Sequence, residues 1–229
     1  KLMIMLRNFF LVITALALAA GAFSCGEDDP NGGGDTFDRG ALLQHYAENI
    51  IQPAYEELAA QTTVLVSQWD VFVNDPTEAN LGLVREAWTD AYLTWQSANA
   101  CNFGPAGEEG TRKRLIEEIG TFPVDVDGIE GFIAAGDNSL NNFDRDTRGF
   151  LAVEYLLFGQ SETTADVLAA LQEPNRGAYL TAVLDHLREQ VDRVNDAWPA
   201  YADTFIANDG TDVGSATSQL YNEFVRSFE

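Results

Sequence analysis

One short apolar stretch, RGFLAVEYLLFG at residues 148–159, carries a single carboxylate, Glu154. On a helix, residues three apart lie on the same face, so a histidine at position 151 and Glu154 would together hold one cation. The sequence has Leu151 there, and leucine offers no lone pair. A single carboxylate binds zinc or ferrous iron weakly unless other groups converge on it. Glu154 is therefore a weak candidate ligand, and iron or another divalent cation is the only kind of cofactor that this stretch suggests.

Three nearby carboxylates, Asp125, Asp127 and Glu130, could converge on such an ion. However, Asp127 followed three residues later by Glu130 is typical of a helix start, which predicts caps and not ligands. The two histidines, His45 and His186, lie on other predicted helices, where we expect surface or packed residues.

Glu154 also needs an explanation as a structural residue. A carboxylate buried on an apolar helix is costly without a partner. It therefore either points into a wet cleft or pairs with an arginine, for which Arg112, Arg114 and Arg148 are candidates. The residues alone leave both possibilities open.

Peptidase chemistry is not supported by these side chains. A metallopeptidase needs a metal to polarise the carbonyl and activate water, and a base to accept the proton. With leucine and not histidine at position 151, the chain lacks the ligand pair that would hold such a metal. Cys101 has no histidine beside it in sequence, and the serines lack the elbow motif of a nucleophile. We expect no catalytic residues.

The charge balance restricts the partners. The chain has 13 basic and 36 acidic residues, a formal net charge of -23. Such a surface repels phosphates and anionic lipid headgroups, which excludes nucleic acid as a partner, and it suits cations and basic proteins. Solubility of a secreted protein explains the same acidity.

The N-terminal residues predict export. Residues 1–24 contain the apolar run FFLVITALALAAGAF, which is short for a membrane span and typical of a signal peptide. The run leads into AFSC, which resembles a bacterial lipoprotein cleavage box with Cys25 as the lipidated residue; an ordinary secretory peptide is the alternative. Residues 25–38 then form a flexible acidic tether, and CGEDD resembles a tag for the outer surface. The predicted protein is an outer-membrane lipoprotein, facing either the periplasm or the exterior, that meets the membrane through this anchor.

Beyond residue 38 the pattern is helical and predicts an all-α fold of helical bundles. Apolar residues recur at three-, four- or seven-residue steps from 41 to 73, with Pro53 expected to kink or divide that run. The helix expected from about 215 shows Leu220, Tyr221 and Phe224 on one side. Either earlier helices cover this face or the sequence is truncated, and we expect truncation.

Four stretches together resemble the imelysin family of bacterial envelope lipoproteins, some classed as metallopeptidases and several linked to iron uptake. They are NIIQPAYEELA (49–59), LVREAWTDAYLTWQSANACNFGPA (83–106), FPVDVDGIEGFI (122–133) and RGFLAVEYLLFG (148–159). The resemblance implies two packed four-helix-type bundles, residues 39–135 and an incomplete second bundle at 136–229, with a site near their junction. Its motif is Gly-x-His-x-x-Glu, of which Gly149 and Glu154 match and Leu151 does not.

These observations predict a non-catalytic binding protein of the cell envelope in an iron or haem acquisition context. Gly149, Leu151 and Glu154 are its candidate ligand-binding residues, and components of iron or haem uptake are its expected partners. The alternatives are a metallopeptidase with an altered metal site and a structural surface lipoprotein that binds other proteins.

Overall fold

The structure is a computed structural model that describes residues 37–109, 113–159 and 163–227. The predicted signal peptide at 1–24 and Cys25 lie outside the described residues. The α-helices are α2 (Arg39–Tyr46), α3 (Gln52–Asn74), α4 (Glu78–Ala98), α5 (Leu115–Ile119), α6 (Val126–Ala135), α7 (Phe150–Phe158), α8 (Thr164–Leu171), α9 (Pro174–Ala207) and α10 (Ala216–Arg226). Shorter helical turns are the π-helical η2 (Ala47–Ile51) and the 3-10 turns η3 (Asn99–Cys101), η4 (Gly104–Ala106) and η5 (Arg145–Thr147). The described residues contain no β-strand, which confirms the all-α prediction.

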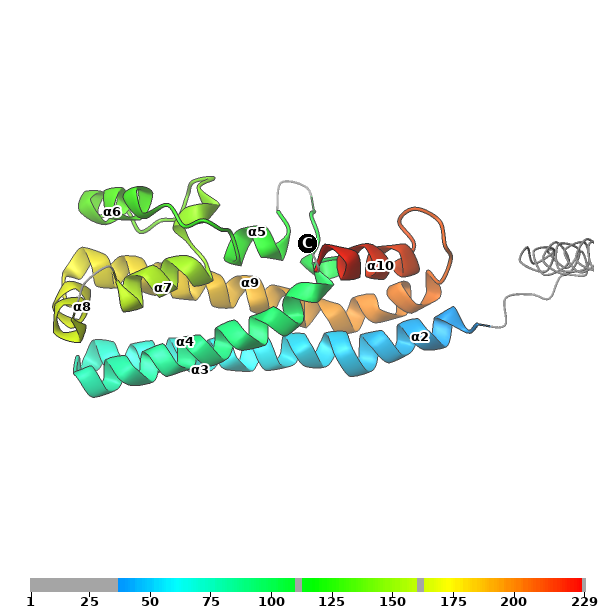
Figure 1. Ribbon diagram of the computed structural model, residues 1–229, viewed down its shortest axis with the longest axis horizontal. Helices are drawn as coiled ribbons and strands as arrows, with labels where there is room; N and C mark the ends of the chain where they lie inside the picture. The colour runs from blue at the N-terminus through cyan, green and yellow to red at the C-terminus, as the bar shows by residue number, and fades with distance from the viewer. Residues whose placement is uncertain (1–36, 110–112, 160–162, 228–229) are drawn as a thin grey trace, which may run out of the picture. The chain divides into compact units, whose positions relative to one another are not determined.

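Three long helices form the centre of the unit that spans residues 39–229. α3 packs against both α4 and α9, and α5 and α6 lie over α9 (Figure 1). α3 and α9 come from opposite sides of the boundary expected between residues 135 and 136. The division into two bundles stays a prediction.

Pro53 perturbs its helix as expected. Proline has no N–H and its ring collides with the preceding turn, so a regular helix cannot continue through it unchanged. Here the chain widens into the π-helical turn η2 immediately before α3, and Pro53 stands in the first turn of α3. α2, η2 and α3 therefore follow one another without a loop.

The core is rich in aromatic side chains. Trp69, Trp95 and Trp198 are almost fully buried, and burial of one large apolar side chain stabilises a fold by about 1.5–3 kcal/mol. The indole N–H of Trp69 donates to the Thr181 hydroxyl at 2.8 Å, which joins α3 to α9.

The FGPA sequence at 103–106 is fixed against α9. Phe103 stacks on Phe205 with ring centroids 5.6 Å apart. Gly104 has φ +55°, and a Cβ there would lie 2.5 Å from the Tyr201 ring. Only glycine combines this backbone conformation with so close an approach.

The apolar face of α10 is not covered by the earlier helices of the described chain. Tyr221 and Phe224 are 67% and 56% exposed, and Leu220 is only partly buried. None of the described helices combines the length and the hydropathy that crossing a membrane requires.

Candidate functional site

The motif glycine sets the start of α7. Gly149 has φ +79°, a region that side chains with a Cβ avoid. A Cβ at this position would lie 2.4 Å from the carbonyl oxygen of Ile119, which ends α5. Gly149 therefore lets the first turn of α7 approach the backbone of α5, a structural role that needs no ligand.

An aromatic row then fixes α7 against α4. The indole N–H of Trp88 donates to the carbonyl oxygen of Phe150 at 3.0 Å. The Trp88 ring also contacts Phe158 edge-on at 5.3 Å between centroids, and Tyr92 contacts Phe150 at 5.6 Å. The contacts at both ends of α7 prevent rotation of the helix, so the face that it turns to solvent is fixed.

That solvent face carries the positions that correspond to the histidine and the glutamate of the motif, Leu151 and Glu154. Glu154 is exposed, Leu151 is half-buried one turn earlier, and Phe158 is exposed one turn later. The Glu154 side chain lies in solvent, so it does not need the partner that a buried carboxylate would require. Two of the three candidate arginines have other partners, because Arg114 pairs with Glu223 and Arg148 with Glu118. Arg112 lies outside the described residues.

The expected caps of α6 are partly wrong as well. Asp125, and not Asp127, is the N-cap, and its side chain accepts from the N–H of Gly128 at 3.0 Å. Glu130 instead accepts from Arg176 and from the Tyr155 hydroxyl, each at 2.6 Å. Burial raises the pKa of Glu130, but the two hydrogen bonds together with the charge of Arg176 outweigh it and leave the pKa below its ordinary value.

In the described part of the chain, no three His, Cys, Asp or Glu side chains gather closely enough to hold a metal ion. The structure thus keeps Asp125, Asp127 and Glu130 from forming such a group with Glu154. His45 is exposed on α2, where its ring lies 3.3 Å from the Asn49 amide nitrogen.

Sequence reasoning missed a buried charged cluster that adjoins the start of the motif helix. We define it as Glu118, Arg145, Arg148 and His186. The distances to a carboxylate oxygen of Glu118 are 2.8 Å from Arg145 Nε, 3.5 Å from Arg148 Nη2 and 3.8 Å from His186 Nε2. Arg148, the residue before Gly149, also donates to the carbonyl oxygens of Leu140 and Asn142.

Burial dominates the electrostatics of this cluster. It lowers the pKa of the Arg148 guanidinium, although the Glu118 carboxylate acts in the opposite direction. Burial and then the charge of Arg148 lower the pKa of His186. In the described chain, the Nε of Arg148 and the Nε2 of His186 are buried without a hydrogen-bond partner. The cluster ties α5, the loop before α7 and α9 together.

One signal could have pointed to Glu118. Leu115, Glu118 and Ile119 stand at positions i, i+3 and i+4, which places the carboxylate on the buried stripe of its helix. A buried carboxylate requires cationic partners. Nothing local in the sequence shows which arginines supply them.

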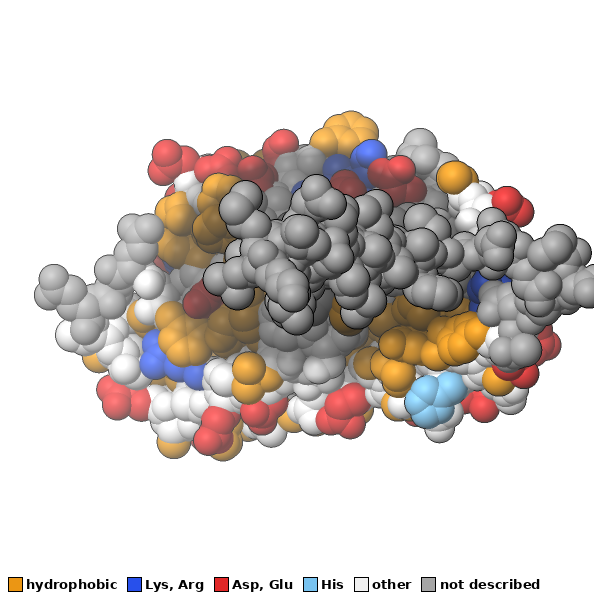
Figure 2. Space-filling model, turned by 45° about the vertical axis from the view of Figure 1, so that its right-hand side comes forward, with side chains coloured by type: hydrophobic (Ala, Val, Ile, Leu, Met, Phe, Trp, Pro, Cys, Tyr) orange, Lys and Arg blue, Asp and Glu red, His pale blue; other side chains and the backbone are white. Residues whose placement is uncertain are grey.

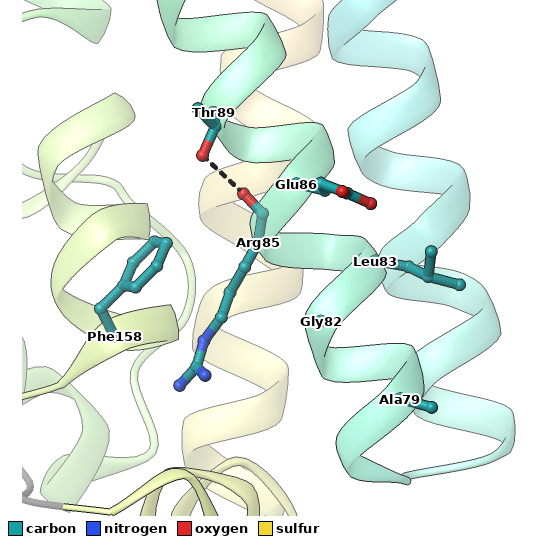
Figure 3. A pocket seen from close by; sticks show the side chains of 7 residues that line it. All are labelled: Ala79, Gly82, Leu83, Arg85, Glu86, Thr89 and Phe158. Carbon is teal, nitrogen blue, oxygen red and sulfur yellow. Dashed lines mark hydrogen bonds between the residues drawn. The ribbon is translucent and has the colours of Figure 1, made fainter.

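A shallow hollow of about 470 Å³ adjoins Phe158 at the end of α7. Arg85 extends toward Phe158, while Glu86 and Leu83 point to the other side of α4 (Figure 3). The guanidinium lies 5.2 Å from the Phe158 ring centroid and donates through Nε to the carbonyl oxygen of Leu157 at 2.9 Å. These contacts join α4 to α7 and supply no nucleophile or base.

The family of the chain follows from comparison with known proteins. A family model described as Imelysin, and labelled as a peptidase family, matches residues 51–229. The chain belongs to the imelysin family. The family prediction is thus confirmed, over the core helices and the motif helix alike.

Relatives of this imelysin chain carry names that refer to iron. This chain is 30% identical over 122 residues to iron-regulated protein A of Synechococcus elongatus, a match that covers 53% of this chain and 32% of the relative. The chain thus spans about a third of the length of that curated relative.

Two solved structures share the fold. An iron-regulated protein A precursor from Parabacteroides distasonis has a TM-score of 0.68 and 21% identity, over 84% of this chain and 57% of the other. An imelysin-like protein from Psychrobacter arcticum has a TM-score of 0.67 and 20% identity, over 83% and 59%. At these identities the two structures support the helical fold alone.

Proposed function

We propose that this imelysin-family protein binds an iron-containing ligand in the cell envelope and does not cleave peptides. Two solved or curated relatives are named as iron-regulated proteins, which supports the iron context. The observation that carries the non-catalytic part is Leu151, which stands where the family motif has its histidine and shares the exposed face of α7 with Glu154.

The chemistry of this face favours an iron complex over a bare cation. One exposed carboxylate binds a free divalent ion weakly. Beside Glu154, however, Leu151 and Phe158 offer apolar contact area, since one is half-buried and the other is 39% exposed. A ligand such as haem, with a flat apolar body around its iron, uses both kinds of group.

A metallopeptidase with an altered ligand set is the second candidate, supported by the label of the matching family model. It requires a metal that activates water. It predicts peptide cleavage by the purified protein that a chelator abolishes.

Calorimetric titration of the parent chain, Glu154→Ala and Leu151→His with haem, ferrous, ferric and zinc ions tests the proposal. We expect haem or iron to bind the parent and to bind Glu154→Ala at least about tenfold more weakly, a loss of about 1.4 kcal/mol. Leu151→His should gain zinc affinity, because it restores an i, i+3 ligand pair. Val64→His is the control, since position 64 is exposed and has no carboxylate three or four residues away.

Tight zinc or iron binding by the parent at Glu154, together with chelator-sensitive cleavage, would contradict the proposal and establish the peptidase. If neither haem nor iron binds the parent, the proposal that the protein binds an iron-containing ligand is refuted.

The same proposal places the protein at a membrane through a lipid on Cys25. Its support is the sequence before that residue, an apolar run of signal-peptide length that leads into AFSC. Metabolic labelling with palmitate should mark the parent chain and not Cys25→Ala; equal labelling of both would exclude this anchor.

A further inference from the structure

Arg85 is an arginine without a carboxylate partner, and it adjoins the α7 face that the proposed function uses. Within the described chain its guanidinium forms hydrogen bonds and a ring contact but no ion pair. Nε donates to the carbonyl oxygen of Leu157, and Nη1 lies 3.4 Å from the Thr164 hydroxyl. Among the described residues Nη2 has no hydrogen-bond partner, so it is free to donate to a ligand. The Arg176 guanidinium, which also lies beside α7, instead pairs with Glu130 at 2.6 Å.

The hollow beside Phe158 gives this guanidinium room for one end of a small ligand. Its volume of about 470 Å³ lies within the range of about 300–1,000 Å³ that small-ligand sites occupy. Its wall on α4 includes Gly82, where an added Cβ would meet nothing within 4 Å. Glu86 also belongs to the lining, but its carboxylate points to the other side of α4 from Arg85 (Figure 3). None of the described lining residues therefore neutralises the charge of Arg85.

The unpaired charge of Arg85 favours an anionic group in the hollow. Burial lowers the pKa of the guanidinium below its ordinary value, because a charge that is partly removed from water is less stable. The group nevertheless stays charged near neutral pH, and an anion beside it offsets the cost of burial. In Figure 2 acidic side chains are spread over the visible face and basic side chains are few, in keeping with the net charge of -23. Repulsion from carboxylates further than about 8 Å away is screened at physiological salt, so the guanidinium in contact decides whether an anionic group is held.

Arg85 continues the series of groups that the α7 face presents. Glu154 and Phe158 are four residues apart, about 6 Å along the helix axis, and the Arg85 guanidinium lies 5.2 Å from the Phe158 ring centroid. A carboxylate, an apolar surface and a cation therefore lie within the length of one small molecule. We infer, on the basis of the proposed function, that Arg85 binds a carboxylate carried by the iron-containing ligand. The ligand is then an iron complex with an apolar body and an acidic substituent, a class to which haem belongs through its propionate groups.

Haem and its dimethyl ester together isolate the contribution of the carboxylate. The ester keeps the iron and the apolar ring, but its esterified propionate groups carry no charge. Both compounds are titrated against the full parent chain, Arg85→Gln and Arg85→Lys, and binding is followed by the absorbance of the porphyrin. Arg188→Gln is the matched control, because it removes the same charge from an arginine of α9 that pairs with Asp185 and does not line the hollow.

We expect the parent to bind haem about tenfold more tightly than the ester, because the ester cannot form the charge-assisted hydrogen bond with Arg85. Arg85→Gln should weaken the binding of haem about tenfold more than it weakens the binding of the ester. Arg85→Lys keeps the charge without the planar guanidinium and should retain part of the preference for haem. Arg188→Gln should show the same preference as the parent. Circular dichroism melts confirm that each variant is folded.

The ester separates failure of this inference from failure of the proposed function. If the parent binds haem and the ester with equal affinity, the inference is overturned and the binding of an iron-containing ligand stands. If Arg85→Gln weakens both compounds equally, Arg85 serves only to pack α4 against α7, which overturns the inference in the same way. If neither compound binds the parent, haem is excluded as the ligand of the proposed function and the inference fails with it.

Discussion

Replacing Gly149 by alanine is the sharpest test of how the motif helix is positioned. The backbone at Gly149 has φ 79° and ψ -167°, a region that glycine alone adopts readily and that costs another residue about 1–3 kcal/mol. The added Cβ would also lie 2.4 Å from the carbonyl oxygen of Ile119 and 2.6 Å from its carbonyl carbon. A backbone neighbour cannot rotate away as a side chain does, and forced overpacking costs about 1–3 kcal/mol more. We therefore expect Gly149→Ala to lower the free energy of unfolding by about 2–6 kcal/mol.

Urea unfolding followed by circular dichroism measures this loss, with Gly131→Ala as the matched control. Gly131 is exposed within α6, and a Cβ there meets nothing within 4 Å. Alanine favours a helix interior over glycine by about 0.5–1 kcal/mol, so the control should be more stable than the parent. If Gly149→Ala unfolds within about 0.5 kcal/mol of the parent, the motif glycine is not required for packing and the reasoning is refuted.

Two further predictions concern the buried charged cluster. Glu118→Gln leaves Arg145 and Arg148 buried without their carboxylate, so it should destabilise the protein by about 3–5 kcal/mol in the same urea assay. The control Glu108→Gln removes one partner of an exposed pair with Lys113 and should cost under about 1 kcal/mol. Similar losses for both would contradict the buried network. Burial and the charge of Arg148 hold the pKa of His186 in the folded protein below the ordinary 6.5 that it has in the unfolded chain. Between the folded and the unfolded pKa, the unfolded chain binds more protons, so the stability of the fold rises with pH. Acidification through about pH 6.5 should therefore destabilise the parent more than His186→Gln, with the charges of Glu118, Glu189, Arg145 and Arg148 present in both; parallel pH profiles would exclude this titration.

Much of the site could not be read from the sequence, and α7 shows why. Apart from Glu154, every residue of α7 is apolar or aromatic. Periodicity identifies the solvent face of a helix only when polar and apolar residues alternate around it. The sequence therefore left open whether Glu154 is solvated or pairs with an arginine, and the contacts of Phe150 and Phe158 with α4 turn Glu154 outward. The replacement of the motif histidine by Leu151 was visible directly.

The sequence by itself determined the features that depend on near neighbours along the chain. The helical periodicity, the irregular turn before Pro53 and the family stretches up to the motif helix all follow from spacings of a few residues. Only the tertiary structure decided the partners of Glu118, which are 27, 30 and 68 residues away at Arg145, Arg148 and His186. Local spacing fixes which residues share a helix face, but which faces meet depends on how all the helices pack at once.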